Sequence, residues 1–134
     1  MHSLDCLVNP APWSARQYAT LCMEPAGEHV LIAQMESVPC GFIVYHLLLD
    51  EANIHNIAVH PSQQRLGVAR TLVGRALENI SAQDASRCLL EVRASNHAAQ
   101  GLYHSLGFSR DGLRKNYYTS PEGREDGILM SRAL

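Results

Sequence analysis

The segment Gln64-x-x-Gly67-x-Ala69 has residue types that suit it to binding phosphate. It begins a predicted helix, where the first backbone N–H groups have no partner within the helix and the helix dipole adds partial positive charge. A pyrophosphate can accept hydrogen bonds from these N–H groups, and its negative charge is stabilised by the helix dipole. Gly67 lets phosphate oxygens approach the backbone, and Arg65 and Arg70 can add charge-assisted contacts. A short pattern with one glycine also fits a plain polar connection, so the surrounding elements must decide between the two interpretations.

Three strands are predicted before this segment. Two of them, Glu28–Met35 and Cys40–Leu49, form an antiparallel hairpin through residues 37–39, and the third covers Asn53–Val59. After the segment, apolar residues recur at spacings of three and four. This periodicity predicts an amphipathic helix from Gly67 to Ser81.

Further elements follow that helix. Cys88–Val92 is a short buried strand, and Asn96 caps a second helix. Two final strands, one from Phe108 onward and one over Glu125–Ala133, surround a loop at Thr119–Gly123.

An early helix is predicted over Pro12–Met23, with Ser14 as its cap. The order is therefore helix, three strands, helix, strand, helix, two strands. Strands separated by a helix run parallel, so Asn53–Val59 and Cys88–Val92 form a parallel pair. We expect one α/β (α+β) domain over residues 1–134, with a mixed central sheet and helices on both faces.

The composition fits a single globular domain, since 46% of the 134 residues are hydrophobic and 18% are charged. A net charge of −2 gives no reason to expect a nucleic-acid or membrane partner. The four cysteines and seven histidines lack the spacing of a metal site. The N-terminus has no basic region followed by an apolar stretch, and Cys40–Leu49 is too short to span a bilayer. We expect a cytoplasmic protein with reduced thiols.

Two runs of residues carry a resemblance to a known family. Residues 57–61, Ile-Ala-Val-His-Pro, followed by the Gln64 segment, are similar to the acetyl-CoA signature of the GNAT superfamily of N-acetyltransferases. Leu90–Asn96 and then Leu102-Tyr103 resemble the second half of that signature. Within the superfamily, Lys115–Tyr118 and Gly123–Asp126 look like the RimI-type enzymes. Those enzymes acetylate the N-terminal alanine of a small-subunit ribosomal protein.

This resemblance implies a GNAT fold and acetyl-CoA as cosubstrate, with no metal. It implies cofactor contacts from the strand before the loop, the loop itself and the second helix: Ile57, Ala58, Val59, Gln64, Arg65, Leu66, Gly67, Val68, Ala69, Arg70, Asn96 and Tyr103. Glu91 becomes the base, acting directly or through a water, and Tyr103 the acid that protonates the departing thiolate. From the residues alone, Glu91 also fits a solvent-facing strand position, and Tyr103 a packed helix tyrosine.

The residues predicted to contact the acceptor substrate lie in the C-terminal segment, apart from one residue near the N-terminus. The resemblance implies substrate contacts from Trp13, Tyr117, Tyr118, Glu125 and Asp126. The last four also fit a surface loop with ordinary charges. The leading hypothesis is acetylation of the N-terminus of a ribosomal protein; the alternatives are a small-molecule amine as acceptor and a non-catalytic acetyl-CoA-binding module. The presence of Glu91 and Tyr103 argues against the non-catalytic module, since a protein that only binds acetyl-CoA needs neither a base nor an acid.

Two departures from the family pattern affect these expectations. Few residues precede Pro12, so the first strand of the family is expected to be abbreviated. Thr119 follows the two tyrosines where the family commonly has proline, so that turn is expected to be less rigid.

Overall fold

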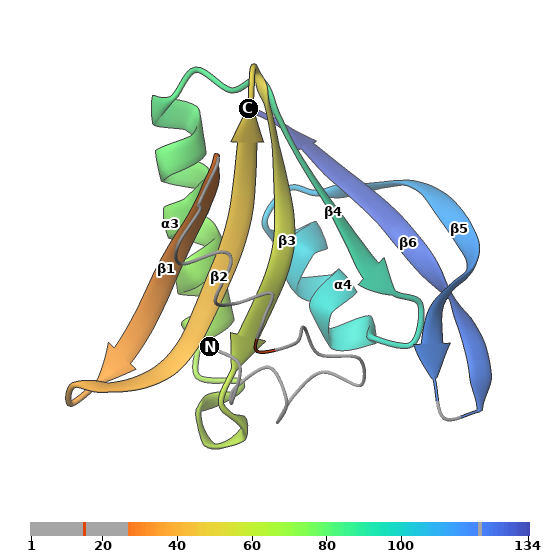
Figure 1. The fold of residues 1–134 in the computed structure, drawn as a ribbon, viewed down its shortest axis with the longest axis horizontal. Coiled ribbons are helices and arrows are strands. Elements are labelled where there is room, and N and C mark those ends of the chain that lie inside the picture. Colours follow the sequence, from red (N-terminus) through yellow and green to blue (C-terminus); the bar gives the residue numbers. More distant parts are fainter. Residues whose placement is uncertain (1–14, 16–26, 121) are drawn as a thin grey trace.

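The computed structural model describes residues 15, 27–120 and 122–134 (Figure 1). Six strands, two α-helices and one short 3-10 helix make up this part of the chain. In order they are β1 (Glu28–Met35), β2 (Val38–Leu48), β3 (Glu51–Val59), η1 (Pro61–Gln63), α3 (Val68–Ala82), β4 (Arg87–Arg93), α4 (His97–Ser105), β5 (Ser109–Ser120) and β6 (Gly123–Ala133). The predicted helix over Pro12–Met23, and with it a helical cover on the second face of the sheet, lies outside the described residues.

One sheet joins all six strands in the order β1-β2-β3-β4-β6-β5. The pair β3 and β4 is parallel, and the other neighbours are antiparallel. The predicted mixed sheet and its parallel pair are therefore confirmed. The turns are tighter than predicted: Met35 already pairs with Val38, and Leu48 with Glu51. Each turn contains two residues, and positive φ at Ser37 and Leu49 (67° and 56°) reverses the chain in so short a space.

The parallel strands separate after a short shared register. Pairing begins at Glu51 with Arg87 and ends at Ile54 with Leu90, although β3 continues to Val59 and β4 to Arg93. Figure 1 shows the two strands diverging toward their carboxyl ends. Beyond Ile54, β3 still pairs with β2 on its other side. Its edge toward β4 is therefore free of strand pairing there.

Both α-helices pack into one hydrophobic core. The buried stripe of α3 follows the predicted spacing, with Leu72, Val73, Ala76, Leu77 and Ile80 in contact with the sheet. Tyr103 of α4 belongs to the same cluster. A hydrogen bond of 2.8 Å from Arg70 to Ser105 links the two helices directly. The core therefore fixes the start of α3 and the end of β4 relative to α4.

Candidate active site

The loop before α3 presents a helix start with no side-chain cap. Gly67 is the N-cap residue, and its φ of 84° lies in the left-handed region that favours glycine. Thr71 N–H donates to the Gly67 carbonyl at 3.0 Å. The amides of Val68, Ala69 and Arg70 precede this bond and have no partner within the helix. A Cβ on Gly67 would meet no atom within 4 Å, so the space beside it is open to an anion.

The side chains of the loop hold its shape. Gln64 Nε2 donates to the Val59 carbonyl at 3.1 Å, which ties the loop to the end of β3. Arg65 has a φ of 64°, and Leu66 is exposed. Arg70 uses one Nη2 to reach Ser105 and keeps other N–H donors. The structure thus places the predicted phosphate loop at the end of the free edge of β3.

The free edge of β3 carries Ile57, Ala58 and Val59. Ala58 and Val59 are buried, and Ile57 packs against the core. The N–H of Ile57 donates to its neighbour Asn56 Oδ1 at 2.9 Å. This segment runs into the phosphate loop through His60 and η1. An extended ligand lying along β3 would therefore end at the start of α3.

Glu91 lies on β4 just beyond the last residue that pairs with β3. Its side chain is 27% exposed, and Oε1 is 3.6 Å from Nη2 of Arg114. Its other oxygen, Oε2, is buried and, within the part of the chain that the structure describes, has no hydrogen-bond partner. A buried acceptor without a partner is costly, so it calls for a water or a donor from a ligand. Glu91 is therefore partly buried, with one carboxylate oxygen shielded from solvent.

Tyr103 projects from α4 into the core and is only 5% exposed. Burial raises the pKa of its phenol to about 12, and neighbouring Tyr118 and Cys88 raise it as well. Its ring packs edge-on against Phe108 at 5.8 Å between centroids. The phenol therefore stays protonated at neutral pH and can donate a proton. Packing and a chemical role are compatible in this position.

The two adjacent tyrosines lie at a bulge in β5. Between the pairs Arg114–Gly127 and Tyr118–Glu125, β5 contains three residues and β6 contains one. Both rings lie over Gly127, where a Cβ would come within 3.1 Å of Tyr118 and 3.4 Å of Tyr117. The rings contact each other edge-on at 4.9 Å. Successive strand residues normally face opposite sides, so the bulge is what brings both rings together.

Charged side chains of β6 hold this bulge. Asn116 has a φ of 55°, its N–H donates to Asp126 Oδ1 at 2.9 Å, and its carbonyl accepts from Arg124 Nη1 at 3.0 Å. The Ser95 hydroxyl donates to the Glu125 carboxylate, with Oγ 2.9 Å from Oε1 and 3.2 Å from Oε2. The two carboxylates predicted to face the substrate are thus bonded to the chain itself. The predicted loop Thr119–Gly123 is also shorter than expected, because β5 reaches Ser120 and β6 begins at Gly123.

Tyr118 connects the two predicted proton-transfer side chains. Burial raises its pKa to about 12; Glu91 and then Tyr117 raise it further, while Arg93 and Arg114 act in the opposite direction. Tyr118 in turn acts on Tyr103. Glu91 on β4, Tyr118 on β5 and Tyr103 on α4 therefore form a group in which the pKa of each phenol depends on a neighbouring side chain.

Sequence reasoning missed two arginines of this group. The Cζ of Arg93 lies 4.6 Å from the ring centre of Tyr118, and that of Arg114 lies 5.0 Å from the ring centre of Tyr117. Period-two spacing on β4 was the available signal for Arg93, since it shares a face with Glu91. No such signal existed for Arg114, whose contact with Glu91 joins strands distant in sequence.

The remaining predicted site residues are placed as follows. Asn96 caps α4 by accepting a bond from the Ala99 N–H at 3.1 Å, as predicted. Trp13 lies outside the described residues. Among residues 27–120 and 122–134, no group of three His, Cys, Asp or Glu side chains is arranged to hold a metal ion. None of the helices in the described part of the chain has the length and hydropathy needed to cross a membrane.

The described residues bring together a pair of parallel strands that separate and a helix start without a side-chain cap. Glu91, a carboxylate, and Tyr103, a protonated phenol, lie on the strand and the helix that follow, and these features are those expected of an acyl-transferring enzyme. The chain belongs to the acetyltransferase (GNAT) family, whose family model matches residues 1–108. It is an acetyl-CoA-dependent N-acetyltransferase, as the sequence resemblance implied.

Curated relatives and a solved structure agree with this assignment. The chain is 39% identical over 122 residues to the [Ribosomal protein bS18]-alanine N-acetyltransferase of Escherichia coli, with 90% of this chain and 80% of the relative covered. It is 31% identical over 133 residues to the enzyme of that name from Haemophilus influenzae, with 98% and 88% covered. The crystal structure of the ribosomal-protein-S18-alanine N-acetyltransferase from Escherichia coli matches with a TM-score of 0.93 and 33% identity, over 99% of this chain and 84% of that one.

Proposed function

We propose that this enzyme acetylates the N-terminal alanine of the small-subunit ribosomal protein bS18 in the cytoplasm. The observation that carries the proposal is the 39% identity to a bS18-alanine N-acetyltransferase over 90% of this chain. The paired rings of Tyr117 and Tyr118 beside Glu91 support it, since they form a wall next to the candidate base. A wall of rigid aromatic rings suits a peptide backbone and a small first side chain.

The proposed path of acetyl-CoA runs from the start of α3 along β3 to the point where β3 and β4 separate. In this proposal the amides of Val68, Ala69 and Arg70 bind the pyrophosphate, with Arg65 adding charge. The pantetheine arm lies along the free edge of β3 at residues 57–59, where its amides can pair with the strand as a peptide does. The thioester then lies where β3 and β4 part, next to Glu91. Asn96 remains a proposed contact for this arm in addition to its capping role.

Glu91 and Tyr103 divide the proton movements. An N-terminal amine is mostly protonated at neutral pH, so it must lose a proton before it attacks the thioester carbonyl. Glu91 Oε2, which has no partner in the described chain, accepts that proton directly or through a water. The amine forms a C–N bond, the C–S bond then breaks, Tyr103 gives its proton to the departing sulfur, and the nitrogen loses its second proton to solvent. Coenzyme A and the acetylated amine leave, solvent takes the proton held by Glu91, and solvent restores the phenol.

Replacing Tyr103 with phenylalanine should slow turnover by about 10²-fold, because the leaving sulfur loses its proton donor. Since burial raises the pKa of Tyr103 to about 12, the wild-type rate should show no loss from ionisation of this phenol up to about pH 10. Steady-state kinetics between about pH 6 and 10 check both points. A fall in the wild-type rate above pH 9 that disappears in Tyr103→Phe would contradict a pKa this high.

The proposed acceptor is tested by comparing three substrates. A short peptide copying the N-terminus of bS18 should be acetylated once, at its α-amine, as measured by mass spectrometry of the product. The same peptide with a blocked α-amine should not react, and spermidine should react far more slowly than the free peptide. Preference for spermidine would overturn the acceptor assignment. Tight acetyl-CoA binding without turnover of any acceptor would instead indicate a non-catalytic module.

A further inference from the structure

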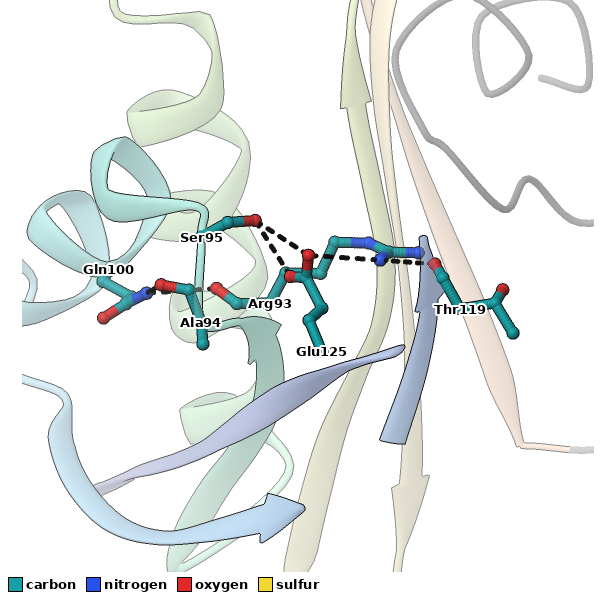
Figure 2. Close-up of polar contacts among 6 residues, drawn as sticks. All are labelled: Arg93, Ala94, Ser95, Gln100, Thr119 and Glu125. Carbon is teal, nitrogen blue, oxygen red and sulfur yellow. Dashed lines mark hydrogen bonds and ion pairs between the residues drawn. The ribbon is translucent and has the colours of Figure 1, made fainter. Parts of the chain in front are cut away.

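Arg93 is the last residue of β4 and lies two positions beyond Glu91. Its side chain is only 14% exposed, although it carries a permanent charge. Buried charges are costly unless they are paired, so the partners of this guanidinium should reveal its role. Within the described part of the chain, the partners of this guanidinium lie on the hairpin formed by β5 and β6, and Figure 2 shows two of them, Thr119 and Glu125. We call residues 115–126, the end of that hairpin with both tyrosines, the acceptor hairpin.

The guanidinium of Arg93 holds three groups of the acceptor hairpin. Its Nη1 donates to the Thr119 carbonyl at 2.9 Å and lies 3.9 Å from Glu125 Oε2. Its plane covers the ring of Tyr118, with Cζ 4.6 Å from the ring centre. Arginine is suited to this task because its planar group can stack on an aromatic ring and donate hydrogen bonds simultaneously.

The backbone around Arg93 is fixed from the opposite side. Gln100 of α4 donates through Nε2 to the carbonyls of Arg93 and Ala94, each at 3.0 Å, as Figure 2 shows. Ser95 donates to the same Glu125 carboxylate that Arg93 approaches. The end of β4 is thus anchored to α4, which also carries Tyr103. Because Arg93 contacts the ring of Tyr118, the anchored end of β4 also restricts the position of Tyr118.

The acceptor hairpin needs such support because of its place in the sheet. Among the described residues, β5 is an edge strand that pairs only with β6, and its bulge interrupts that pairing next to the tyrosines. A tyrosine ring on an interrupted edge strand has rotational freedom that a substrate would have to remove on binding. Stacking against Arg93 removes that freedom beforehand.

We propose that Arg93 is a positioning residue that holds the acceptor hairpin, and Tyr118 in particular, in the geometry that receives the acceptor peptide. The inference rests on the proposed function, because it assumes a peptide acceptor beside Tyr118. Arg93 acts through Tyr118, Thr119 and Glu125 and contacts no reacting atom. Its loss should therefore weaken use of the acceptor while leaving acetyl-CoA binding unchanged.

Kinetics of Arg93→Gln and Arg93→Lys test this role. Arg93→Gln should raise the KM for the bS18 peptide by about tenfold, because the stack and the charge-assisted bonds are lost together, while the KM for acetyl-CoA stays within about twofold. Arg93→Lys keeps the charge near Glu125 but loses the planar stack, so it should give an intermediate value. Equal increases in both KM values would contradict a positioning role, because general destabilisation would produce them.

Arg87 provides a matched control on the same strand and face. It also reaches the hairpin of β5 and β6, with Nη2 3.6 Å from Asp111 on β5 and 3.1 Å from Ser131 on β6, but it lies at the other end of β4. Arg87→Gln removes an arginine from an equivalent β4-to-β5 contact. Its KM for the peptide should equal that of the wild type. A tenfold increase there as well would show that any loss of a β4 arginine has this effect, and would overturn the proposal.

Amide hydrogen exchange tests the positioning without relying on activity. In Arg93→Gln, exchange should accelerate in residues 115–126 and remain unchanged in α3, whereas Arg87→Gln should leave residues 115–126 protected. Unchanged exchange in the acceptor hairpin of Arg93→Gln would overturn the inference. If the wild type prefers spermidine over the peptide, the proposed acceptor is wrong, while the exchange result still decides whether Arg93 orders the hairpin. Should Arg93→Gln fail to fold, Glu125→Gln perturbs the same contact from β6 and should give the same exchange pattern.

Discussion

Gly67→Glu is expected to abolish acetyl-CoA binding. Gly67 is the N-cap of α3, and the amides after it are the proposed pyrophosphate site. A glutamate there places negative charge against the phosphates and fills the open space beside the backbone. The backbone at position 67 has a φ of 84°, which adds strain of about 1–2 kcal/mol for any residue with a Cβ. Isothermal titration with acetyl-CoA should show a Kd at least about 100-fold weaker than that of the wild type.

Two further variants separate charge and position in this prediction. Gly67→Ala introduces the backbone strain without the charge, so it should weaken binding much less than Gly67→Glu. Gly74→Glu adds the same charge in the middle of the same helix, and a Cβ there likewise meets no atom within 4 Å. Its acetyl-CoA affinity should remain within about twofold of the wild type, since the helix-terminal field fades beyond the first turn. Normal acetyl-CoA binding by Gly67→Glu would mean that the cofactor phosphates bind elsewhere.

The second large effect is expected from Glu91→Gln. Glutamine has nearly the same shape but cannot accept the proton of the attacking amine, so kcat should fall by about 10²–10⁴-fold. The affinity for acetyl-CoA should stay nearly unchanged, because Glu91 lies at the acetyl end of the proposed path. Single-turnover measurements with the bS18 peptide give the rate, and calorimetry gives the affinity.

The surroundings of Glu91 make this experiment specific. Oε2 has no partner among the described residues, so the substitution breaks no bond at that oxygen, and Oε1 loses only an ion pair of 3.6 Å with half-exposed Arg114. Such pairs contribute roughly 0–1 kcal/mol, so the fold should survive. Glu51→Gln, at the exposed start of β3, is the matched carboxylate control and should keep wild-type turnover. A Glu91→Gln enzyme with wild-type rates from about pH 6 to 9 would remove Glu91 from the role of base.

The helix start suited to phosphate and the element order could be predicted from the sequence because both depend on local chemistry. The three- and four-residue spacing of apolar side chains in α3 and the capping by Asn96 involve neighbours along the chain. Gly67 takes a backbone conformation that few other residues adopt, so its type and position already marked the helix start. The parallel strand pair followed from the intervening helix, which leaves little choice of direction.

Contacts between distant strands could not be predicted in this way. The pairing of Glu91 with Arg114 and the stacking of Arg93 on Tyr118 depend on how β4, β5 and β6 align. That alignment includes a bulge whose location no residue spacing specified, since Asn116 is held by Arg124 and Asp126 from the facing strand. Glu125 and Asp126 stay predicted as substrate contacts, and no sequence pattern indicated that both carboxylates also have partners within the chain.

The sequence by itself determined the elements, the parallel pair and the segment suited to phosphate, because propensity, periodicity and backbone freedom act over a few neighbouring residues. Tertiary structure alone decided where β3 and β4 separate, which oxygen of Glu91 stays without a partner in the described chain, and how two consecutive tyrosines come to lie over Gly127. Those features depend on strand register and on charges brought together from far apart in the chain. Side chains acquire such neighbours only when the sheet has formed, and the proposed acceptor site is built from them.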